Sequence, residues 1–110
     1  MNTLQQVEKL KKMIDSKLGE NIICYDLRGK STIMDYMVIA TAKADTHVKA
    51  ISEYLLEEMK KGGNPAFAEE GIRSGTWACM DFGDTIVHVM RPKERSFYNL
   101  EAIWGAADKI

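Results

Sequence analysis

Apolar side chains recur about every three to four residues in two segments of the chain, which predicts two amphipathic helices. The first begins at Thr3, which has capping-box spacing with Gln6, and Gly19 is a natural stop at its end. The second begins at Asp45, a suitable N-cap residue, and ends at Gly62-Gly63. The predicted buried stripes are Leu4, Val7, Leu10, Ile14 and Leu18 in the first helix and Val48, Ile51, Leu55 and Met59 in the second.

Other segments have the patterns of β-strands. Residues 21–28 alternate between apolar and polar side chains, and residues 36–41 form a continuous apolar run, typical of a strand covered on both faces. A short strand is expected at residues 66–70. Two apolar runs, 76–82 and 85–90, are joined by Gly83-Asp84, and this link predicts a tight hairpin. Residues 97–104 predict a short C-terminal helix.

The order of these elements is helix, two strands, helix, three strands, helix (αββαβββα), which indicates an α/β fold. The second helix is long enough for a crossover between parallel strands, whereas the hairpins are antiparallel. We therefore expect a mixed sheet of about five strands with helices packed on it. The length favours a single domain that spans residues 1–110.

The two-residue turn fixes the register of the hairpin, and the register sorts its side chains by face. The predicted pairs on the first face are Phe82–Thr85, Met80–Val87 and Ala78–Val89. This face is almost wholly apolar and is expected to lie in the core. The pairs on the second face are Asp81–Ile86, Cys79–His88 and Trp77–Met90. The second face is too apolar for a plain solvent surface and too polar for a dry core, so something covers it.

Two coverings are open for this second face. The C-terminal residues Phe97, Leu100 and Trp104 could pack on it, in which case Trp77 is a core residue. Alternatively a partner protein docks there, since Trp and Met are enriched in protein interfaces. Because the C-terminal segment also carries Tyr98, we expect an exposed aromatic rim in either case.

Charge and cysteine content restrict the function further. The 15 basic and 16 acidic residues nearly cancel, leaving a net charge of −1, whereas nucleic-acid-binding proteins usually have a basic excess. Direct sequence-specific recognition of nucleic acid is therefore not expected. Cys24 and Cys79 fit no zinc spacing and are expected to be reduced. The polar N-terminal helix does not resemble a signal peptide, and the longest apolar run, residues 37–40, cannot span a membrane. These features predict a cytoplasmic protein without membrane contact.

Candidate catalytic groups occur on the second face of the hairpin. Cys79, His88 and Asp81 could in principle form a nucleophilic site. However, they lie in the middle of strands, whereas catalytic groups are concentrated on loops and strand ends. A buried thiol beside a hydrogen-bonded histidine is the simpler interpretation, so no catalytic residue is assigned.

Metal and nucleotide sites are also weakly indicated. Asp81 and Asp84 at the hairpin tip could hold Mg²⁺, but Gly83-Asp84 is equally well explained by the turn itself. Neither His47 nor His88 has a partner at metal-ligand spacing. The sequence contains neither GxxxxGK[ST] nor GxGxxG, and Gly29-Lys30-Ser31 is interpreted as a turn. We expect no metal and no cofactor.

Three segments together resemble the ribosomal silencing factor family, also called Iojap-like. Residues 26–31 and 35–41 are similar to its opening motifs, residues 75–89 to its central hairpin, and residues 95–104 to its closing segment. The likeness runs from about Val7 to Trp104, and the motifs occur in the family's order and at its spacing.

This resemblance implies a mixed-sheet fold related to nucleotidyltransferases but without their catalytic carboxylate motif. It also implies that the protein is not an enzyme. Such proteins bind ribosomal protein fourteen of the large subunit, on the face that meets the small subunit. They thereby block subunit joining and reduce translation when nutrients are short. Some relatives assist assembly of the large subunit in organelles.

The resemblance also implies a set of contact residues. The set consists of Trp77, Met80, Asp81, Phe82 and Tyr98. The predicted register places Met80 and Phe82 on the core face, so Trp77 and Asp81 are the stronger candidates. Two positions depart from the family pattern: Ala78 follows the Trp where a larger aliphatic residue is usual, and Ala42 stands where Gly is common. The smaller Ala78 is expected to weaken packing or contact at the hairpin.

Three functional hypotheses follow from the sequence. The first is a ribosome-binding translational repressor that acts by steric occlusion. The second is a small nucleotidyltransferase-like enzyme that uses Asp81 and Asp84 with Mg²⁺, which a thermal shift with nucleotide and Mg²⁺ would reveal. The third is a homodimer built through the aromatic face, which light scattering would reveal.

Overall fold

The computed structural model describes residues 3–105 and 107–110, which form an α/β fold. The helices are α1 (Thr3–Ser16), α2 (Asp45–Lys61), α3 (Pro92–Tyr98) and α4 (Leu100–Ile103). The strands are β1 (Glu20–Asp26), β2 (Tyr36–Thr41), β3 (Ala68–Glu70), β4 (Trp77–Asp81), β5 (Thr85–Met90) and β6 (Asp108–Lys109). Among these described residues, no helix combines the length and the apolar content that a membrane span requires.

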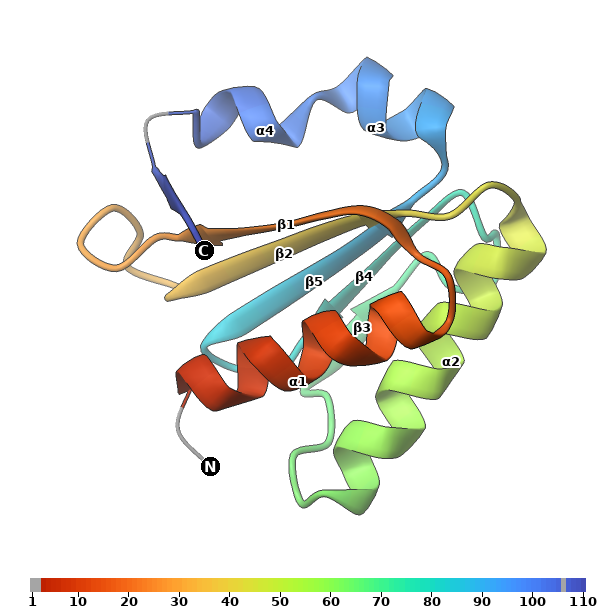
Figure 1. Ribbon diagram of the computed structural model, residues 1–110, viewed down its shortest axis with the longest axis horizontal. Coiled ribbons are helices and arrows are strands. Elements are labelled where there is room, and N and C mark those ends of the chain that lie inside the picture. The colour runs from red at the N-terminus through yellow and green to blue at the C-terminus, as the bar shows by residue number, and fades with distance from the viewer. Residues whose placement is uncertain (1–2, 106) are drawn as a thin grey trace.

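The strands form one mixed sheet in the order β3-β4-β5-β2-β1-β6. Strands β2 and β5 are parallel, and the connection between them contains α2, as the crossover argument predicted. The other neighbouring strands are antiparallel. Helices α1 and α2 cover one face of the sheet, and α3 and α4 lie on the opposite face (Figure 1). The sheet therefore separates two layers of helix.

The larger core lies between the sheet and the helices α1 and α2. All six residues of β2 are buried, as expected for a strand covered on both faces. The predicted stripe of α2 is fully buried, and so are Val7, Leu10 and Ile14 of α1. Each buried aliphatic side chain of this kind stabilises the fold by about 1.5–3 kcal/mol. The hydrophobic pattern thus determines which faces of α1 and α2 meet the sheet.

A smaller core lies beneath α3 and α4. It contains Tyr25, Leu27, Met37, Ile39, Met90 and Ala107, with Trp77, Leu100 and Trp104 packed against it. The C-terminal segment is broken into two short helices at Asn99, whose φ of 45° is left-handed. The sequence predicted one helix over residues 97–104, so this break is a correction. Asn tolerates the left-handed region better than most residues, which explains why the break falls there.

Arg95 ties this C-terminal segment to the sheet. Its side chain is 11% exposed, and its Nε donates to Glu101 Oε1 at 2.8 Å. Its Nη1 donates to the carbonyl oxygen of Asn21 at 2.7 Å and to Thr41 Oγ1 at 2.9 Å. One guanidinium therefore connects α3, α4, β1 and β2.

The sheet has six strands rather than the five predicted. The additional strand, β6, is only two residues long and pairs with β1 through Tyr25 and Asp26. The amide of Ile110 also donates to the carbonyl of Cys24 at 2.9 Å. A pairing of two residues is held by backbone groups and has no side-chain alternation, so the hydrophobic pattern could not reveal it.

Helix ends also differ from the prediction. The N-cap of α2 is Ala44, and Asp45 lies in the first turn. Helix α1 ends at Ser16, and Leu18 is 76% exposed with a φ of 65°, so it is not part of the buried stripe. The Thr3 hydroxyl donates to Asp84 Oδ2 at 3.3 Å, which links α1 to the hairpin tip. Strand β3 begins at Ala68, two positions later than expected.

Candidate protein-binding site

The hairpin of β4 and β5 has the register that its two-residue turn predicted. The paired residues are Trp77–Met90, Ala78–Val89, Cys79–His88, Met80–Val87 and Asp81–Ile86. Gly83 has a φ of 94°, which only glycine adopts readily, and the Phe82 amide donates to the Thr85 carbonyl at 2.9 Å. One face of the hairpin therefore packs in the larger core, and the other face is turned towards α3.

Trp77 forms the centre of an aromatic cluster on this second face. Its Nε1 donates to His88 Nδ1 at 3.0 Å, and its ring lies 4.8 Å from that of Tyr98, centroid to centroid. Tyr98 also contacts Phe97 edge-on at 5.1 Å. Trp77 is half-buried, whereas Tyr98 is 52% and Phe97 79% exposed. The aromatic cluster, defined as Trp77, His88, Phe97 and Tyr98, therefore reaches solvent.

Tyr98 contacts Trp77 directly, whereas Leu100 and Trp104 pack on the smaller core further along the sheet. Phe97, which the sequence offered as a cover for this face, points to solvent instead. Of the two coverings considered from the sequence, the C-terminal segment therefore covers this face only in part. One side of the indole is shielded by the chain's own helix, and the rim around it stays open.

Beyond Trp77, the second face continues as an open strip of sheet. Cys79, Asp81 and Ile86 are half-buried there. The register of β3 adds two exposed residues to the same face, because Ala68 pairs with Asp81 and Glu70 pairs with Cys79. We call these five residues the open sheet face. It combines apolar side chains with two carboxylates beside the aromatic cluster.

The structure divides the five predicted contact residues into two groups. Trp77, Asp81 and Tyr98 lie on the aromatic side of the sheet and are at least partly accessible. Met80 and Phe82 are 0% and 5% exposed and belong to the larger core, where the register argument placed them. These two side chains present no surface to a partner in this conformation, and they support the hairpin from behind.

Sequence reasoning missed three residues of this surface, Ala68, Glu70 and Ile86, as parts of a site. Ile86 could have been found, since the predicted hairpin register already placed it opposite Asp81. Ala68 and Glu70 could not, because β3 and β4 are joined by a longer link, residues 71–76, that does not fix a register.

The geometry around Cys79 is unlike that of an activated nucleophile. Burial, and then the nearby carboxylates of Glu70 and Asp81, raise the pKa of the Cys79 thiol. Burial lowers the pKa of His88 to about 4, so this imidazole is neutral at physiological pH. His88 Nδ1 accepts the hydrogen bond from Trp77, which leaves its proton on Nε2. Catalytic thiols need the opposite shift, towards a lowered pKa.

Both carboxylates at the hairpin tip, Asp81 and Asp84, accept hydrogen bonds from other groups of the chain. Asp81 Oδ1 accepts a hydrogen bond from the Gly83 amide at 2.8 Å, and Asp84 Oδ2 accepts the Thr3 hydroxyl. The carbonyl of Asp84 accepts the amides of Asp35 and Tyr36, which fixes the tip against the start of β2. Within the described residues, no group of three or more His, Cys, Asp or Glu side chains is placed to hold a metal ion.

Comparison with known proteins identifies the family of this chain. The sequence profile described as "Ribosomal silencing factor during starvation" matches residues 1–110. The chain belongs to the ribosomal silencing factor family. The protein named Ribosomal silencing factor RsfS from Haemophilus influenzae is 40% identical over 99 residues, which cover 90% of this chain and 97% of the relative. The protein of the same name from Zymomonas mobilis is 38% identical over 106 residues, covering 93% of this chain and 80% of the relative.

The fold agrees with this membership of the ribosomal silencing factor family. A crystal structure of a protein from Chromobacterium violaceum matches with a TM-score of 0.93 at 30% sequence identity, covering 96% of this chain and 88% of that one. Ribosomal silencing factors are ribosome-associated regulators of translation. On the hairpin side, the accessible surface of this chain consists of the aromatic cluster and the open sheet face.

Proposed function

We propose that this ribosomal silencing factor represses translation in the cytoplasm by binding the large ribosomal subunit and sterically blocking the joining of the small subunit. Its contact on the large subunit is ribosomal protein fourteen, and repression operates when nutrients are limiting. The observation that carries the proposal is the partly exposed Trp77–Tyr98 pair beside the open sheet face.

The chemistry of this surface supports a protein contact. Trp and Tyr are the residues that most often dominate binding energy, because they bury a large area with few rotatable bonds. The Trp77 ring is already held by His88 and Tyr98, so little side-chain entropy is lost when a partner covers it. The contact needs no catalytic group.

The charge of the surface favours a basic partner. Asp81 and Glu70 lie close enough to Cys79 to raise the pKa of its thiol, so the open sheet face carries negative charge. No ion pair within the described residues neutralises either carboxylate. Proteins that bind RNA, as ribosomal proteins do, are typically basic. Electrostatic complementarity would speed association and select such a partner.

The size of the molecule is sufficient for steric occlusion. The principal extents of the chain are 35 × 33 × 22 Å. Packed side chains contact one another at about 4 Å. A rigid body of this size on the joining face would separate the two subunit surfaces by several times that distance. Repression then requires binding alone.

Binding to isolated large subunits tests the proposal. The wild-type protein should sediment with large subunits in a sucrose gradient and should prevent their joining to small subunits. Trp77→Ala and Tyr98→Ala should each weaken binding by tenfold or more, since aromatic anchors contribute about 2 kcal/mol or more. Ile33→Ala removes an exposed apolar side chain on the loop between β1 and β2 and should leave binding unchanged.

Two results would contradict the proposal. One is a wild-type protein that does not sediment with large subunits at any tested ratio. The other is an aromatic surface that is used mainly by a second copy of the chain, shown by a dimer in light scattering that Trp77→Ala dissociates while large-subunit binding is unchanged.

A further inference from the structure

A second candidate site lies at the tip of the β4–β5 hairpin, where the tip meets the start of α1 and the link between α2 and β3 (Figure 1). A pocket of about 320 Å³ opens there. Thr3 and Gln6 of α1, Asn64 and Phe67 of the link, and residues 82–84 of the hairpin line it. Three segments that are distant in the sequence therefore converge on one small cavity, which we call the hairpin-tip pocket.

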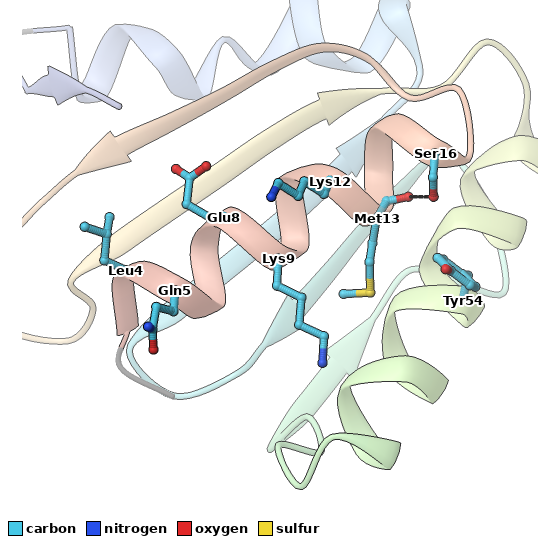
Figure 2. A pocket seen from close by; sticks show the side chains of 8 residues that line it. All are labelled: Leu4, Gln5, Glu8, Lys9, Lys12, Met13, Ser16 and Tyr54. Atoms are coloured by element: carbon cyan, nitrogen blue, oxygen red, sulfur yellow. Dashed lines mark hydrogen bonds between the residues drawn. The ribbon is translucent and has the colours of Figure 1, made fainter.

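A larger open groove of about 750 Å³ follows α1 but offers less to a ligand (Figure 2). Leu4 and Met13, two of its apolar lining residues, are nine positions apart on α1. They therefore lie on different sides of the helix and form no continuous apolar floor. The Ser16 hydroxyl in this groove already donates to the carbonyl of Met13 at 2.7 Å. The hairpin-tip pocket, in contrast, contains side-chain amides that still lack a partner.

Gln6 contributes a buried amide that the fold leaves unpaired. It is 9% exposed, and its side chain makes no hydrogen bond within residues 3–105 and 107–110. Its spacing from Thr3 predicted a capping box, but the Thr3 hydroxyl donates to Asp84 Oδ2 instead. The side-chain polar atoms of the described residues that are both unpaired and sealed from solvent are Ser52 Oγ and Thr85 Oγ1, so the Gln6 amide is reached from the pocket that it lines. An unpaired buried amide is costly, and a ligand that bonds to it removes that cost.

Phe67 supplies an open aromatic ring to the same pocket. At 80% exposure it is the most exposed large apolar side chain of the described residues. Its amide donates to the Asp81 carbonyl at 2.8 Å, which fixes its backbone beside the hairpin. The edge of its ring lies over Gly83, where a Cβ would come within 3.0 Å of Phe67 Cε2. Such a ring is a platform on which another flat ring can stack.

The remaining polar groups select the kind of ring. Asn64 is half-buried, and its side-chain amide also has no hydrogen bond within the part of the chain that the structure describes. An amide presents a donor and an acceptor side by side, and this pair matches N6 and N7 of adenine.

The charge of the pocket selects a neutral ligand. Asp84 is exposed, and no ion pair of the described residues neutralises it. Among those residues, no lysine or arginine lines the pocket. A phosphate group would be repelled by Asp84 and would find no cation to pair with. A nucleoside is therefore favoured over a nucleotide or an RNA strand.

We propose that the hairpin-tip pocket binds the adenine base of a nucleoside. The base would stack on Phe67 with its polar edge towards the amides of Gln6 and Asn64, and ribose hydroxyls would donate to Asp84. The cavity volume of about 320 Å³ lies at the lower end of the range for small-molecule sites. Binding involves no metal ion and no group transfer, so it differs from the nucleotidyltransferase hypothesis. It also goes beyond the proposed function, because no residue of the aromatic cluster or the open sheet face lines this pocket.

Isothermal titration calorimetry with adenosine tests the proposal on the full chain. The wild-type protein should bind adenosine saturably and should bind AMP more weakly, because the phosphate of AMP is repelled by Asp84. Phe67→Ala should weaken adenosine binding by about tenfold, since the stacking platform is lost. Gln6→Leu should weaken it by a similar factor without lowering the stability of the protein in urea, because the amide bonds to nothing in the fold. A purely structural role of Gln6 would give the opposite result.

A matched phenylalanine separates this pocket from the aromatic cluster. Phe97 is 79% exposed, close to the value for Phe67, and Phe97→Ala should leave adenosine binding unchanged. Phe67→Ala should in turn leave binding to the large ribosomal subunit unchanged. Circular dichroism and urea unfolding confirm that each variant is folded. A failure of large-subunit binding by the wild type would leave the adenosine result unaffected.

Three outcomes would overturn the proposal. The first is a wild-type protein that does not bind adenosine even at millimolar concentration. The second is equal weakening of adenosine binding by Phe67→Ala and Phe97→Ala. The third is tighter binding of an adenine-rich single-stranded RNA than of adenosine, with loss of that binding in Phe67→Ala, which would assign the pocket to an RNA base.

Discussion

The indole of Trp77 donates its N–H proton to Nδ1 of His88 at 3.0 Å, across adjacent strands of one hairpin. This bond holds the imidazole in the tautomer that carries its proton on Nε2 and sets the tilt of the indole ring. The same bond satisfies the indole N–H of Trp77, which therefore needs no hydrogen bond to water. The aromatic surface proposed as the contact is therefore ordered before a partner arrives.

Burial of His88 predicts a specific dependence of stability on pH. Its pKa falls from 6.5 in the unfolded chain to about 4 in the folded protein, so the unfolded state binds more protons between these values. The free energy of unfolding should fall as the pH drops from 6.5 towards 4, by about 3 kcal/mol in total. Urea unfolding of the wild type and of His88→Gln at several pH values measures this. The difference in the free energy of unfolding between the wild type and His88→Gln should narrow steadily as the pH falls below 6.5. Parallel pH profiles of the two proteins would show that His88 is not buried in its neutral form.

Removing Arg95 should release α3 and α4 from the sheet. The guanidinium makes hydrogen bonds to Glu101, Asn21 and Thr41, and the side chain is nearly buried. We expect Arg95→Met to lower the free energy of unfolding by about 2–3 kcal/mol. Hydrogen exchange should become faster in residues 92–103. Lys93→Met on the exposed side of the same helix is the control and should change stability by less than about 0.5 kcal/mol. Equal effects of the two substitutions would contradict the anchoring role.

Two glycines with similar backbone angles should respond differently to alanine. Gly71 and Gly29 have φ values of 81° and 80°, so both substitutions carry the cost of a left-handed residue, about 1 kcal/mol. A Cβ at Gly29 meets no atom within 4 Å, whereas one at Gly71 would collide with the carbonyl oxygen of Trp77. Gly71→Ala should therefore destabilise the protein by about 2 kcal/mol more than Gly29→Ala, as expected for a steric clash in a packed region. Thermal unfolding of both variants checks this, and similar losses would show that the Gly71 backbone can move away.

The reactivity of Cys79 should report on the open sheet face. Burial and the carboxylates of Glu70 and Asp81 raise the pKa of this thiol, so alkylation at pH 7.5 should be slower than for a free cysteine. Glu70→Gln removes one negative charge and should speed alkylation by about twofold, because the thiolate becomes more populated. Glu69→Gln is the matched control, since Glu69 pairs with Met80 on the other face of the sheet. Equal rates in the two variants would place the Glu70 carboxylate away from Cys79.

Several features of the fold were accessible from sequence because their causes are local. The stripe of α2 is buried as predicted, since helical periodicity directly encodes which face is apolar. The β4–β5 register is also correct, since a turn of two residues permits only one alignment of the strands that keeps the apolar faces together. Local patterns were less reliable at the ends of elements. Leu18 was predicted in the buried stripe of α1 but lies beyond the end of that helix, and the predicted C-terminal helix is interrupted at Asn99.

The candidate site was predicted only in part. The predicted register correctly placed Trp77 and Asp81 on the second face of the hairpin, and their contact with a partner stays a prediction. The contribution of Glu70 depends on how β3 aligns with β4 across residues 71–76, and no local rule fixes that alignment.

The sequence by itself determined which side chains share a face, since the spacing of apolar residues and the geometry of a tight turn act over a few bonds. Only the tertiary structure decided what covers each face. Tyr98 lies on Trp77, Arg95 reaches Asn21 and Thr41, and β6 pairs with β1 because distant segments were brought together by burial of the two cores. The hydrophobic effect that drives this burial depends on area and not on direction, so periodicity specifies that a face is covered without specifying its neighbour.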